Sequence, residues 1–471
     1  FKTMFMKINH KKGALIILCF LSSIFIFGGC SKRTILYPAP IALDAISSNM
    51  KSAGYWTAKL AEPDKILLNG AQIDLLNKEF IKNNLLKDIL SFKDGYYRKR
   101  FPTAYKKTLN SYKKYHHDSL KGGAMEKFIN NINKSINYDI LEPSFAIAVR
   151  AAAIRVLPTN QVLYSSYETQ GLDRVQATQI NLGAPLAVLY ATKDYKWYFV
   201  VTDETEGWIE VQNIAFCSKD DLKQFLDKEV SNQKTSKKQN TLIVSISPIT
   251  DIYADKEKTK FIEQINMGTE LIAVQIQDDL VEIKLPVRDK KGGLEIQRAF
   301  VKVSDISVGY LKYTQRNSLT QAFKLLNYLY GWGGQDANQD CSSYIKNVFA
   351  CFGIKLPRNS AAQIRQSSIL KSVKFNKDMS ADKRNQTIIN QAIAGASLLY
   401  FPGHIMLYIG YENSQAYIIH SIWGYGAKNK KNKTFVINRV MVSDMNLGED
   451  SKRGSLLERL YEIKNIAAQK E

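Results

Sequence analysis

The sequence predicts a multidomain α+β protein with a helical N-terminal domain, two small β-barrels and a C-terminal α+β domain. Three observations predict this order. At 471 residues the chain is too long for one hydrophobic core. A polar segment rich in Lys and Tyr and poor in Gly and Pro precedes two blocks of short β-rich runs. A helical pattern followed by alternating strand patterns then completes the chain.

The N-terminus has the features of an export signal. Basic residues precede an apolar run from Ala14 to Phe27, and two glycines then lead to Cys30. The run is short for a membrane-spanning helix but fits the apolar region of a signal peptide. Because the Gly-Gly-Cys order resembles a bacterial lipobox, we expect residues 1–29 to be a lipoprotein signal peptide and Cys30 to carry lipid. The protein would then be exported and anchored to a membrane of the cell envelope; an uncleaved membrane anchor is the alternative.

The net charge of +21 would suit an anionic partner such as a nucleic acid, a membrane face or a cell wall. The sequence contains no compact Arg-rich patch and no nucleic-acid-binding motif. We therefore expect no nucleic-acid partner, and we expect the membrane contact to be made through the N-terminal lipid.

The residue pattern of the sequence changes twice before residue 310, which divides this part of the chain into three segments. Residues 30–150 read as one helical domain, and residues 151–230 as short strands separated by turn residues. The second segment resembles a bacterial SH3-like domain, including a hairpin at Trp197 and the closing Gly207-Trp208. Residues 231–310 begin with a polar linker and continue as a more diverged β-rich block. This block looks like a second SH3-like barrel.

The last domain, residues 311–471, contains one cysteine in an unusual place. An apolar face that starts at Tyr344 predicts a helix, and Cys341 lies on the same face at the start of that helix. There the unpaired N–H groups and the positive end of the helix dipole favour a thiolate. Cys351, at the other end of the helix, is predicted to be buried and inert.

A thiol nucleophile needs a base, and the two histidines that follow Cys341 are candidates. His404 opens one predicted strand and His420 lies in the next, with a turn around residues 412–415. A two-residue hairpin loop would place the two histidines on opposite faces of the sheet. A three-residue loop, or one bulge, would place them on the same face as diagonal neighbours. The sequence leaves both arrangements open.

Several motifs of this domain resemble one family. The stretches "YGWGG", "DCSSYI", "FGIKLPRNSAAQ", "GASLLYFPGHIMLYIG" and "AYIIHS" look like the NlpC-type family of bacterial cell-wall cysteine peptidases. The preceding domains resemble a lipoprotein subgroup of that family with a helical N-terminal domain and two SH3-like domains. The resemblance implies a papain-like α+β fold in the last domain. It also implies a peptidoglycan stem-peptide hydrolase that cleaves the γ-D-glutamyl to L-diamino acid bond.

The resemblance also assigns roles to residues. It makes Cys341 the nucleophile, His404 the general base and His420 the group that orients His404. Tyr330 in "YGWGG" matches a tyrosine beside the oxyanion and the substrate carboxylate. We expect no metal and no other cofactor.

Two further assignments come from the motifs that flank the cysteine. Asp340 and Ser342 match positions that contact the stem peptide. Arg358, Ser360 and Gln363 match a recurrent stretch that we expect to be mainly structural. The first SH3-like barrel is expected to wall one side of the cleft through the segment from Leu182 to Val211, which would favour short stem peptides.

Two other functions remain open. One is a catalytically silent lipoprotein that uses its SH3-like domains to bind the cell wall. The other is an enzyme of the same fold with different chemistry, such as an amidase or an acyltransferase. The intact Cys341, His404 and His420 argue against the first alternative, and the Asp-Cys-Ser flank argues against the second.

Overall fold

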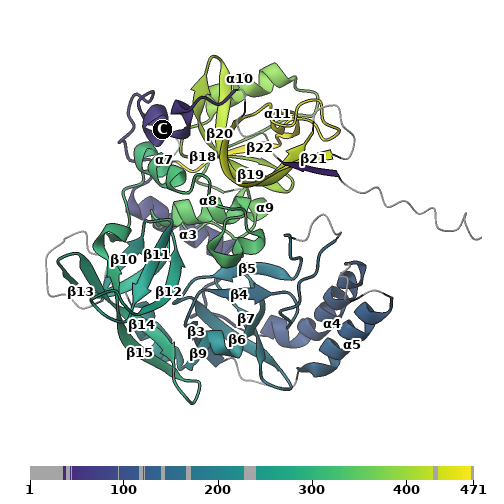
Figure 1. The fold of residues 1–471 in the computed structure, drawn as a ribbon, viewed down its shortest axis with the longest axis vertical. Coiled ribbons are helices and arrows are strands. Elements are labelled where there is room, and N and C mark those ends of the chain that lie inside the picture. The colour runs from purple at the N-terminus through teal and green to yellow at the C-terminus, as the bar shows by residue number, and fades with distance from the viewer. Residues whose placement is uncertain are drawn as a thin grey trace, which may run out of the picture.

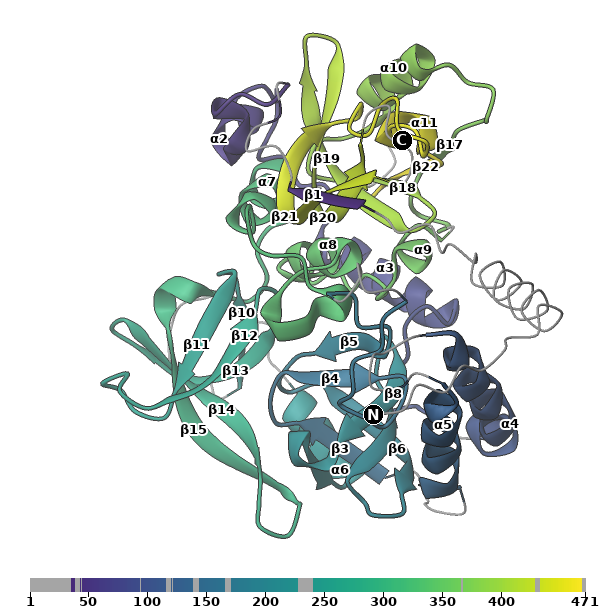
Figure 2. The ribbon, with the colours of Figure 1, turned by 45° about the vertical axis from the view of Figure 1, so that its right-hand side comes forward.

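The structure is a computed structural model, and it describes residues 35–38, 43, 45–93, 95–115, 120, 122–138, 144–165, 171–227, 240–365, 367–427 and 433–467. Figures 1 and 2 show a multidomain α+β protein in which a C-terminal sheet with helices on both faces stands above two smaller β domains. Cys30 and the expected signal peptide lie outside the described residues. No helix within the described ranges is long and apolar enough to cross a membrane.

The first β domain has the strand order β5-β4-β8-β7-β6-β3-β9, and its neighbouring strands are antiparallel. The strands are β3 (Ser144–Ala148), β4 (Ala152–Arg155), β5 (Gln176–Ile180), β6 (Pro185–Thr192), β7 (Trp197–Val201), β8 (Glu206–Glu210) and β9 (Ile214–Cys217). A short strand, β2 (Ile136–Asn137), adds to β6, and helix α6 (Lys219–Leu226) follows β9. Strand β5 therefore lies at one edge of this sheet.

The second β domain repeats the topology of the first. Its strand order is β12-β11-β15-β14-β13-β10-β16, which is the order of the first domain with every strand number raised by seven. A short 3-10 helix precedes the last strand in both domains. The strands are β10 (Thr241–Ser245), β11 (Ile249–Tyr253), β12 (Phe261–Asn266), β13 (Glu270–Gln277), β14 (Leu280–Arg288), β15 (Leu294–Lys302) and β16 (Ile306–Val308).

The C-terminal sheet has the order β1-β21-β20-β19-β18-β22-β17. Its strands are β1 (Ile35–Pro38), β17 (Ser372–Lys374), β18 (Ser397–Phe401), β19 (His404–Glu412), β20 (Gln415–Gly426), β21 (Lys433–Asp444) and β22 (Glu462–Asn465). Neighbouring strands are antiparallel, except that β1 runs parallel to β21. A segment close to the N-terminus thus forms one edge of the C-terminal sheet.

Helices cover both faces of this sheet. They are α7 (Gln315–Lys324), α8 (Cys341–Ala350), α9 (Ser360–Gln363), α10 (Ala381–Gln391) and α11 (Leu456–Arg459). Residues of α7 and α8 share one hydrophobic core with Ile405 and Leu407 of β19. Residues of α10 and α11 pack on the other face with Met406 and Tyr408, as the alternation of side chains along a strand requires.

The N-terminal helices do not share a core of their own. The sequence predicts one helical domain over residues 30–150, whereas the structure distributes these residues over two cores. Helices α2 (Ala53–Thr57) and α3 (Gly70–Lys82) pack with the C-terminal sheet and α8. Helices α4 (Gly95–Ser111) and α5 (Ala124–Ser135) pack on the first β domain, as Figures 1 and 2 also show. Amphipathic helices of this length need an apolar surface to cover, and each pair finds one on a different sheet.

One contact shows how closely the N-terminal segment fits the C-terminal domain. The Trp56 side chain is only 1% exposed and packs against the Tyr417 ring at a centroid distance of 5.3 Å. Gly410 has a φ of +140°, and a Cβ atom there would lie 2.9 Å from the Trp56 ring. Glycine is therefore required at this position both by the backbone and by the close approach of the indole.

Candidate active site

Cys341 is the first residue of α8, as the sequence predicts, and Asp340 caps the helix. The Asp340 carboxylate accepts a 2.8 Å hydrogen bond from the Ser343 backbone N–H, and the Ser343 hydroxyl accepts one of 2.8 Å from the Asp340 N–H. This capping box fixes the first turn of the helix. The Cys341 side chain itself is half-buried where the helix begins.

The surroundings of Cys341 favour the neutral thiol over the thiolate. Burial raises the pKa of the thiol to about 12, and the neighbouring Asp340 carboxylate adds to the rise. The backbone N–H groups of Ile405 and Ser342 lower the pKa, but they do not offset burial. The sequence predicts a thiolate from the helix N-terminus alone. The structure differs because the residue that caps the helix is itself an anion beside the sulfur.

The loop between β19 and β20 has two residues, the shorter of the two lengths considered from the sequence. Glu412 pairs with Gln415, which leaves the two-residue loop Asn413-Ser414 with φ angles of 46° and 59°. Left-handed backbone at both loop positions is typical of the tight hairpin turns that fit the twist of a sheet. With no irregularity, this loop would place His404 and His420 on opposite faces.

A bulge in β19 brings the two histidines together. Tyr408 pairs with Ile418, but Gly410 pairs with Tyr417, so Ile409 is an extra residue in β19. The bulge shifts the parity of the pairing, and His404 and His420 then lie on the same face. The Nε2 atom of His404 is 2.8 Å from the Nδ1 atom of His420.

Ser443 on β21 extends this row of polar groups. Its Oγ atom is 3.2 Å from the Nε2 atom of His420, and both side chains are fully buried. The sequence analysis missed Ser443. An alternating pattern does run through β21, but only the register against β20 shows that this serine reaches the imidazole.

Two choices of tautomers satisfy these distances, because the Ser443 hydroxyl can either accept from His420 or donate to it, and only one of them leaves a lone pair on Nδ1 of His404. If His404 carries its proton on Nε2, it donates to Nδ1 of His420, and His420 then donates from its own Nε2 to Ser443. Nδ1 of His404 is left with its lone pair and no hydrogen-bond partner among the described residues. Since Ile405 directs its backbone N–H at the Cys341 sulfur, the thiol lies beside the residue that follows His404.

Both histidines are held neutral. Burial lowers the pKa of His404 to about 3, and the positive charge of Arg459 lowers it further. Burial also lowers the pKa of His420 well below its usual value, and His404 contributes to that shift. In the free protein at neutral pH, the Cys341 thiol and both imidazoles are therefore neutral.

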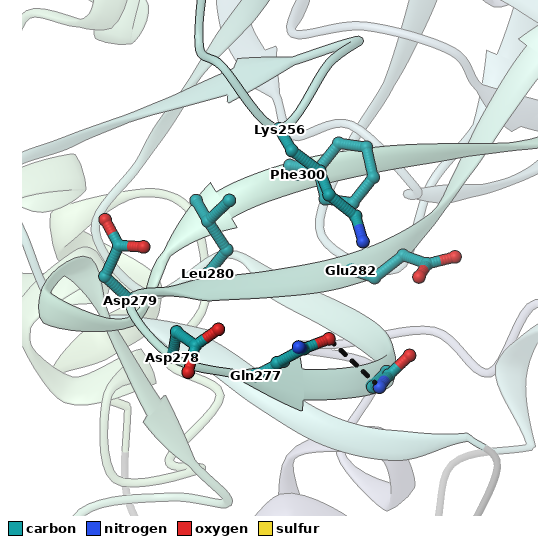
Figure 3. A pocket seen from close by; sticks show the side chains of 8 residues that line it. Lys256, Gln277, Asp278, Asp279, Leu280, Glu282 and Phe300 are labelled. Carbon is teal, nitrogen blue, oxygen red and sulfur yellow. Dashed lines mark hydrogen bonds between the residues drawn. The ribbon is translucent and has the colours of Figure 1, made fainter.

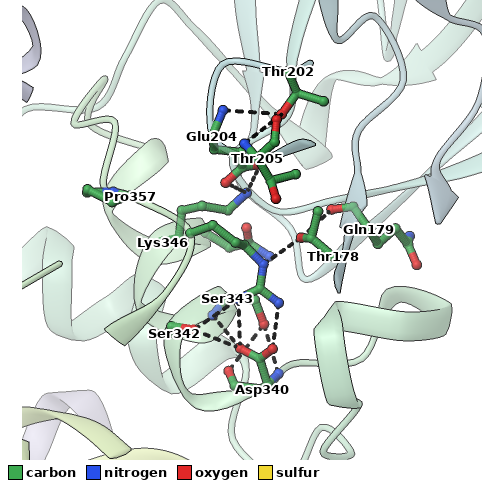
Figure 4. Close-up of polar contacts among 12 residues, drawn as sticks. Thr178, Gln179, Thr202, Glu204, Thr205, Asp340, Ser342, Ser343, Lys346 and Pro357 are labelled. Carbon is green, nitrogen blue, oxygen red and sulfur yellow. Dashed lines mark hydrogen bonds and ion pairs between the residues drawn. The ribbon is translucent and has the colours of Figure 1, made fainter. Parts of the chain in front are cut away.

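Asp340 and Ser342 form hydrogen bonds with Arg358; Figure 4 labels Asp340, Ser342 and Thr178 of this network. The Arg358 guanidinium lies 2.5 Å from Oδ2 of Asp340 and donates a 2.9 Å hydrogen bond to the Ser342 hydroxyl. Its Nε–H donates to the Thr178 hydroxyl of β5 at 2.5 Å. All four side chains are buried. The structure therefore gives Asp340 and Ser342 a place in a buried network, and the substrate contacts expected of them stay a prediction.

The stretch after Arg358 also holds the start of α8. The Gln363 side chain donates hydrogen bonds of 3.0 Å and 2.9 Å to the backbone carbonyls of Ser342 and Pro357. Ser360 is the first residue of α9, which Asn359 caps. These contacts agree with the mainly structural role expected for this stretch.

Tyr330 lies close to the thiol. Burial raises the pKa of its hydroxyl well above the usual value, and the charges of Cys341 and Asp340 raise it further. The backbone N–H of Tyr330 donates a 3.0 Å hydrogen bond to the Asn438 carbonyl of β21, which ties the "YGWGG" loop to the C-terminal sheet. A thiol and a phenol thus lie near each other at the start of α8.

Comparisons with known proteins assign this region to a family. Residues 327–442 match the model of the NlpC/P60 family. The chain contains an NlpC/P60 domain. Members of this family are generally cysteine peptidases. Residues 163–210 match the model of the SH3 domain of the SH3b1 type. Cys341, His404 and His420 all lie inside the NlpC/P60 match, and Ser443 lies just beyond it.

One solved structure has a similar fold over most of the chain. An NlpC/P60 endopeptidase from Photobacterium damselae subsp. piscicida is 19% identical, with a TM-score of 0.72; the match covers 93% of this chain and 100% of that one. An NlpC/P60 family protein from Bacillus cereus ATCC 10987 is 16% identical, with a TM-score of 0.47; the match covers 69% of this chain and 100% of that one. No curated protein matches the chain.

The first β domain borders the NlpC/P60 domain through its edge strand β5. Gly333 has a φ of +68°, and a Cβ atom there would lie 2.5 Å from the Gln176 side chain of β5. The Arg174 guanidinium stacks on the Trp332 ring at 4.4 Å from its centroid. The sequence places this wall in the segment from Leu182 to Val211. The structure uses mainly β5, because β5 is the free edge of its sheet.

One part of the expected segment, the loop that contains Glu204, forms an ion pair with α8. The Lys346 ammonium lies 2.7 Å from the Glu204 carboxylate in the loop between β7 and β8, and both side chains are largely buried (Figure 4). This ion pair holds the first β domain against the middle of α8. It lies one turn of helix away from Cys341, so it positions the domain without lining the thiol.

Other hollows and reactive side chains lie outside this site. A shallow hollow on the second β domain contains Lys256, Phe300 and three acidic residues but none of the residues described above (Figure 3). The described residues contain no group of three or more His, Cys, Asp or Glu arranged to hold a metal ion. Cys351 is buried, as predicted, and burial raises its pKa to about 12.

Proposed function

We propose that this protein is a cysteine peptidase that hydrolyses the γ-D-glutamyl to L-diamino acid bond of peptidoglycan stem peptides. In this proposal Cys341 is the nucleophile, His404 the general base and His420 the orienting group. The observation that carries it is the 2.8 Å contact between Nε2 of His404 and Nδ1 of His420. When His404 donates from Nε2 in that contact, its Nδ1 can accept a proton, and the backbone N–H of the next residue, Ile405, is directed at the Cys341 sulfur within the NlpC/P60 match.

The first step is a proton transfer coupled to attack. Because the thiol pKa is raised and the imidazole pKa is lowered, the resting pair is neutral. Nδ1 of His404 accepts the thiol proton while the sulfur forms a bond to the γ-carbonyl carbon of D-glutamate. The imidazolium that forms donates from Nε2 to His420, which keeps the ring in the orientation that the next step needs.

The tetrahedral oxyanion needs hydrogen-bond donors. We propose the backbone N–H of Cys341, at the start of α8, and the hydroxyl of Tyr330, close to the thiol, as these donors. One such donor contributes roughly 3–4 kcal/mol to transition-state stabilisation. Collapse of the intermediate breaks the C–N bond, and the proton on Nδ1 of His404 passes to the leaving amine. Water, deprotonated by His404, then hydrolyses the thioester and restores the thiol.

The substrate class follows from the domains and the motifs together. The SH3b1-type domain and the NlpC/P60 domain both suggest binding to peptidoglycan. The second β domain, which has the strand order of the first, is proposed to be a second SH3-like barrel. Since β5 of the first domain borders the "YGWGG" loop, we propose that one end of the cleft is closed and that soluble stem peptides react faster than intact sacculi.

We also propose that the protein is exported and that Cys30 carries the lipid that anchors it. Support comes from the signal-like N-terminal sequence and from the pairing of β1 with β21. Four residues lie between Cys30 and the start of β1 at Ile35, so the two Cα atoms are five residue steps, or at most about 18 Å, apart. A lipid on Cys30 would therefore hold the C-terminal sheet close to the membrane. Mass spectrometry of the purified protein tests this, because a mature chain without acyl groups on Cys30 would refute it.

The proposed activity is tested with purified muropeptides and product analysis by mass spectrometry. Wild-type protein is expected to release L-Ala-D-Glu from the diamino acid, and Cys341→Ala is expected to release nothing. Binding without cleavage by both proteins would favour a silent wall-binding protein. Cleavage between the sugar and L-Ala, or transfer of an acyl group, would favour the amidase or acyltransferase alternative.

A further inference from the structure

Arg459 lies beside the proposed catalytic base and forms no ion pair with any of the residues that the structure describes. Its side chain is half-buried at the end of α11, and its guanidinium lies over the Phe401 ring at 3.9 Å from the centroid. Among the described residues, no carboxylate pairs with this guanidinium, and no hydrogen bond from it is formed. Burial and the nearby Arg453 lower the pKa of Arg459, so its charge is not compensated in the free protein.

Other guanidinium groups of the C-terminal domain are used within the fold. Arg358 pairs with Asp340, and Arg384 donates to three backbone carbonyls, those of Asn376, Met379 and Leu460. A half-buried guanidinium that makes no hydrogen bond is costly, because its N–H donors lose water and the Phe401 ring on which it stacks supplies no oxygen acceptor for them. The contacts within the described residues therefore do not explain why an arginine occupies position 459.

Arg459 lies on the His404 side of the site. Phe401 and His404 face each other across the tight turn between β18 and β19, and their ring centroids are 5.5 Å apart. Paired residues of neighbouring strands share a face of the sheet, so the order across this face is His404, Phe401, Arg459. The electrostatic effect of Arg459 on the pKa of His404 agrees with this placement.

The leaving group of the proposed reaction lies on the same side of the site as His404. In the proposed reaction the leaving amine must reach Nδ1 of His404 to take its proton, so the amino acid that carries this amine lies against His404. The carboxylate of an α-amino acid is two bonds from its amine nitrogen. A carboxylate on the leaving residue would therefore lie near the Arg459 guanidinium, which stacks on the Phe401 ring beside His404.

We propose that Arg459 binds a carboxylate of the diamino acid that leaves. This inference rests on the proposed function and adds a determinant for the leaving side of the substrate. Two carboxylates are chemically equivalent here: the α-carboxylate of a C-terminal diamino acid and the side-chain carboxylate of meso-diaminopimelate. Either one would supply the paired acceptor oxygens that a guanidinium favours.

Three tripeptides separate the two sources. L-Ala-γ-D-Glu-meso-diaminopimelate has both carboxylates, L-Ala-γ-D-Glu-L-Lys has only the α-carboxylate, and the C-terminal amide of the lysine peptide has neither. Arg459→Gln is expected to raise KM roughly tenfold or more for substrates that use the carboxylate, and to leave the amide peptide nearly unchanged. A higher KM for both acid peptides would identify the α-carboxylate as the group that Arg459 binds. A higher KM for the diaminopimelate peptide alone would identify the side-chain carboxylate. Arg453→Gln, which removes an exposed charge from the same segment, is the matched control.

Binding to the Cys341→Ala protein gives a readout that needs no hydrolysis. Calorimetry with the same three peptides is expected to show tighter binding of the acids than of the amide, and Arg459→Gln is expected to abolish the difference. The inference is overturned if Arg459→Gln weakens all three peptides equally or weakens none. Wild-type protein that binds the acids through Arg459 but cleaves no stem peptide would instead overturn the proposed function and leave the carboxylate site intact.

Discussion

His404 and His420 lie 2.8 Å apart, from Nε2 to Nδ1, because β19 contains one residue more than its partner strand requires. Without the extra residue Ile409, the two-residue loop of the hairpin would turn the rings to opposite faces of the sheet. The bulge therefore decides whether the proposed base has an orienting group at all. The register of β20 against β21 separately places the Ser443 hydroxyl 3.2 Å from the Nε2 atom of His420.

Ser443 is expected to act as a positioning residue for His420. Ser443→Ala removes one hydrogen bond, so we expect kcat to fall roughly fivefold while KM for the stem peptide stays the same. Ser443→Thr keeps the hydroxyl and should retain most of the activity if the buried site accepts the extra methyl group. Steady-state kinetics of the two variants provide the measurement. Equal kcat values for Ser443→Ala and wild type would exclude the role.

The three cysteines of the described residues are expected to differ in function. Cys341→Ala should abolish hydrolysis, whereas Cys351→Ala and Cys217→Ala should keep most of it, because both thiols pack in hydrophobic cores. Cys351 leaves a cavity and a lost contact to Asn347, so a lower melting temperature is expected for that variant. If all three folded variants lost activity equally, Cys341 could not be the sole nucleophile.

The neutral state of Cys341 can be measured by alkylation. Because burial and Asp340 raise the pKa of this thiol to about 12, its reaction with iodoacetamide should be slow at pH 7 and should accelerate up to at least pH 9. Mass spectrometry of peptides that contain Cys341 gives the rate, and Cys341→Ala gives the background. A fast rate that is constant from pH 5 to pH 8 would instead indicate a thiolate–imidazolium pair.

Arg358 is expected to hold α8 and the first β domain together. Arg358→Met removes the partner of the buried Asp340 carboxylate, and breaking a buried ion pair in this way costs about 3–5 kcal/mol. We expect a large drop in the melting temperature together with lost activity, since Asp340 also caps the helix of Cys341. Arg316→Met is the matched control, because its ion pair with Asp64 is exposed and should contribute little. Similar effects of the two substitutions would contradict this assignment.

The two histidines should make the protein less stable in acid. Their folded-state pKa values lie below 6.5, so the unfolded chain binds more protons than the folded one once the pH falls below 6.5. Their contribution to stability is therefore fully present above pH 6.5 and is lost as the pH falls towards the folded-state values. Each histidine contributes a slope of up to about 1.4 kcal/mol per pH unit in that window.

Urea unfolding between pH 4 and pH 7 measures this slope. His420→Gln removes one of the two groups, so its free energy of unfolding should depend less steeply on pH than that of the wild type. Identical slopes for the two proteins would show that His420 is not held neutral by the fold.

The local patterns of this sequence determine a good deal of the protein. The apolar face after Cys341 predicts the helix that begins at that residue, and the β-rich blocks predict the two β domains. The match to the NlpC/P60 family model confirms the family resemblance that the motifs around Cys341 and His404 indicate. These features can be read from the sequence because helix period, strand alternation and motif spacing depend only on residues close together in the chain.

Other features were decided by the tertiary structure. Register and packing between distant parts of the sequence place His404 and His420 on one face of the sheet. They also decide the contact with Ser443 and the position of Arg459. The N-terminal helices divide between two cores because apolar surface is available on two sheets. The thiol of Cys341 is neutral because burial and a neighbouring carboxylate outweigh the helix terminus. Burial and proximity are properties of the packed chain, and no local pattern contains them.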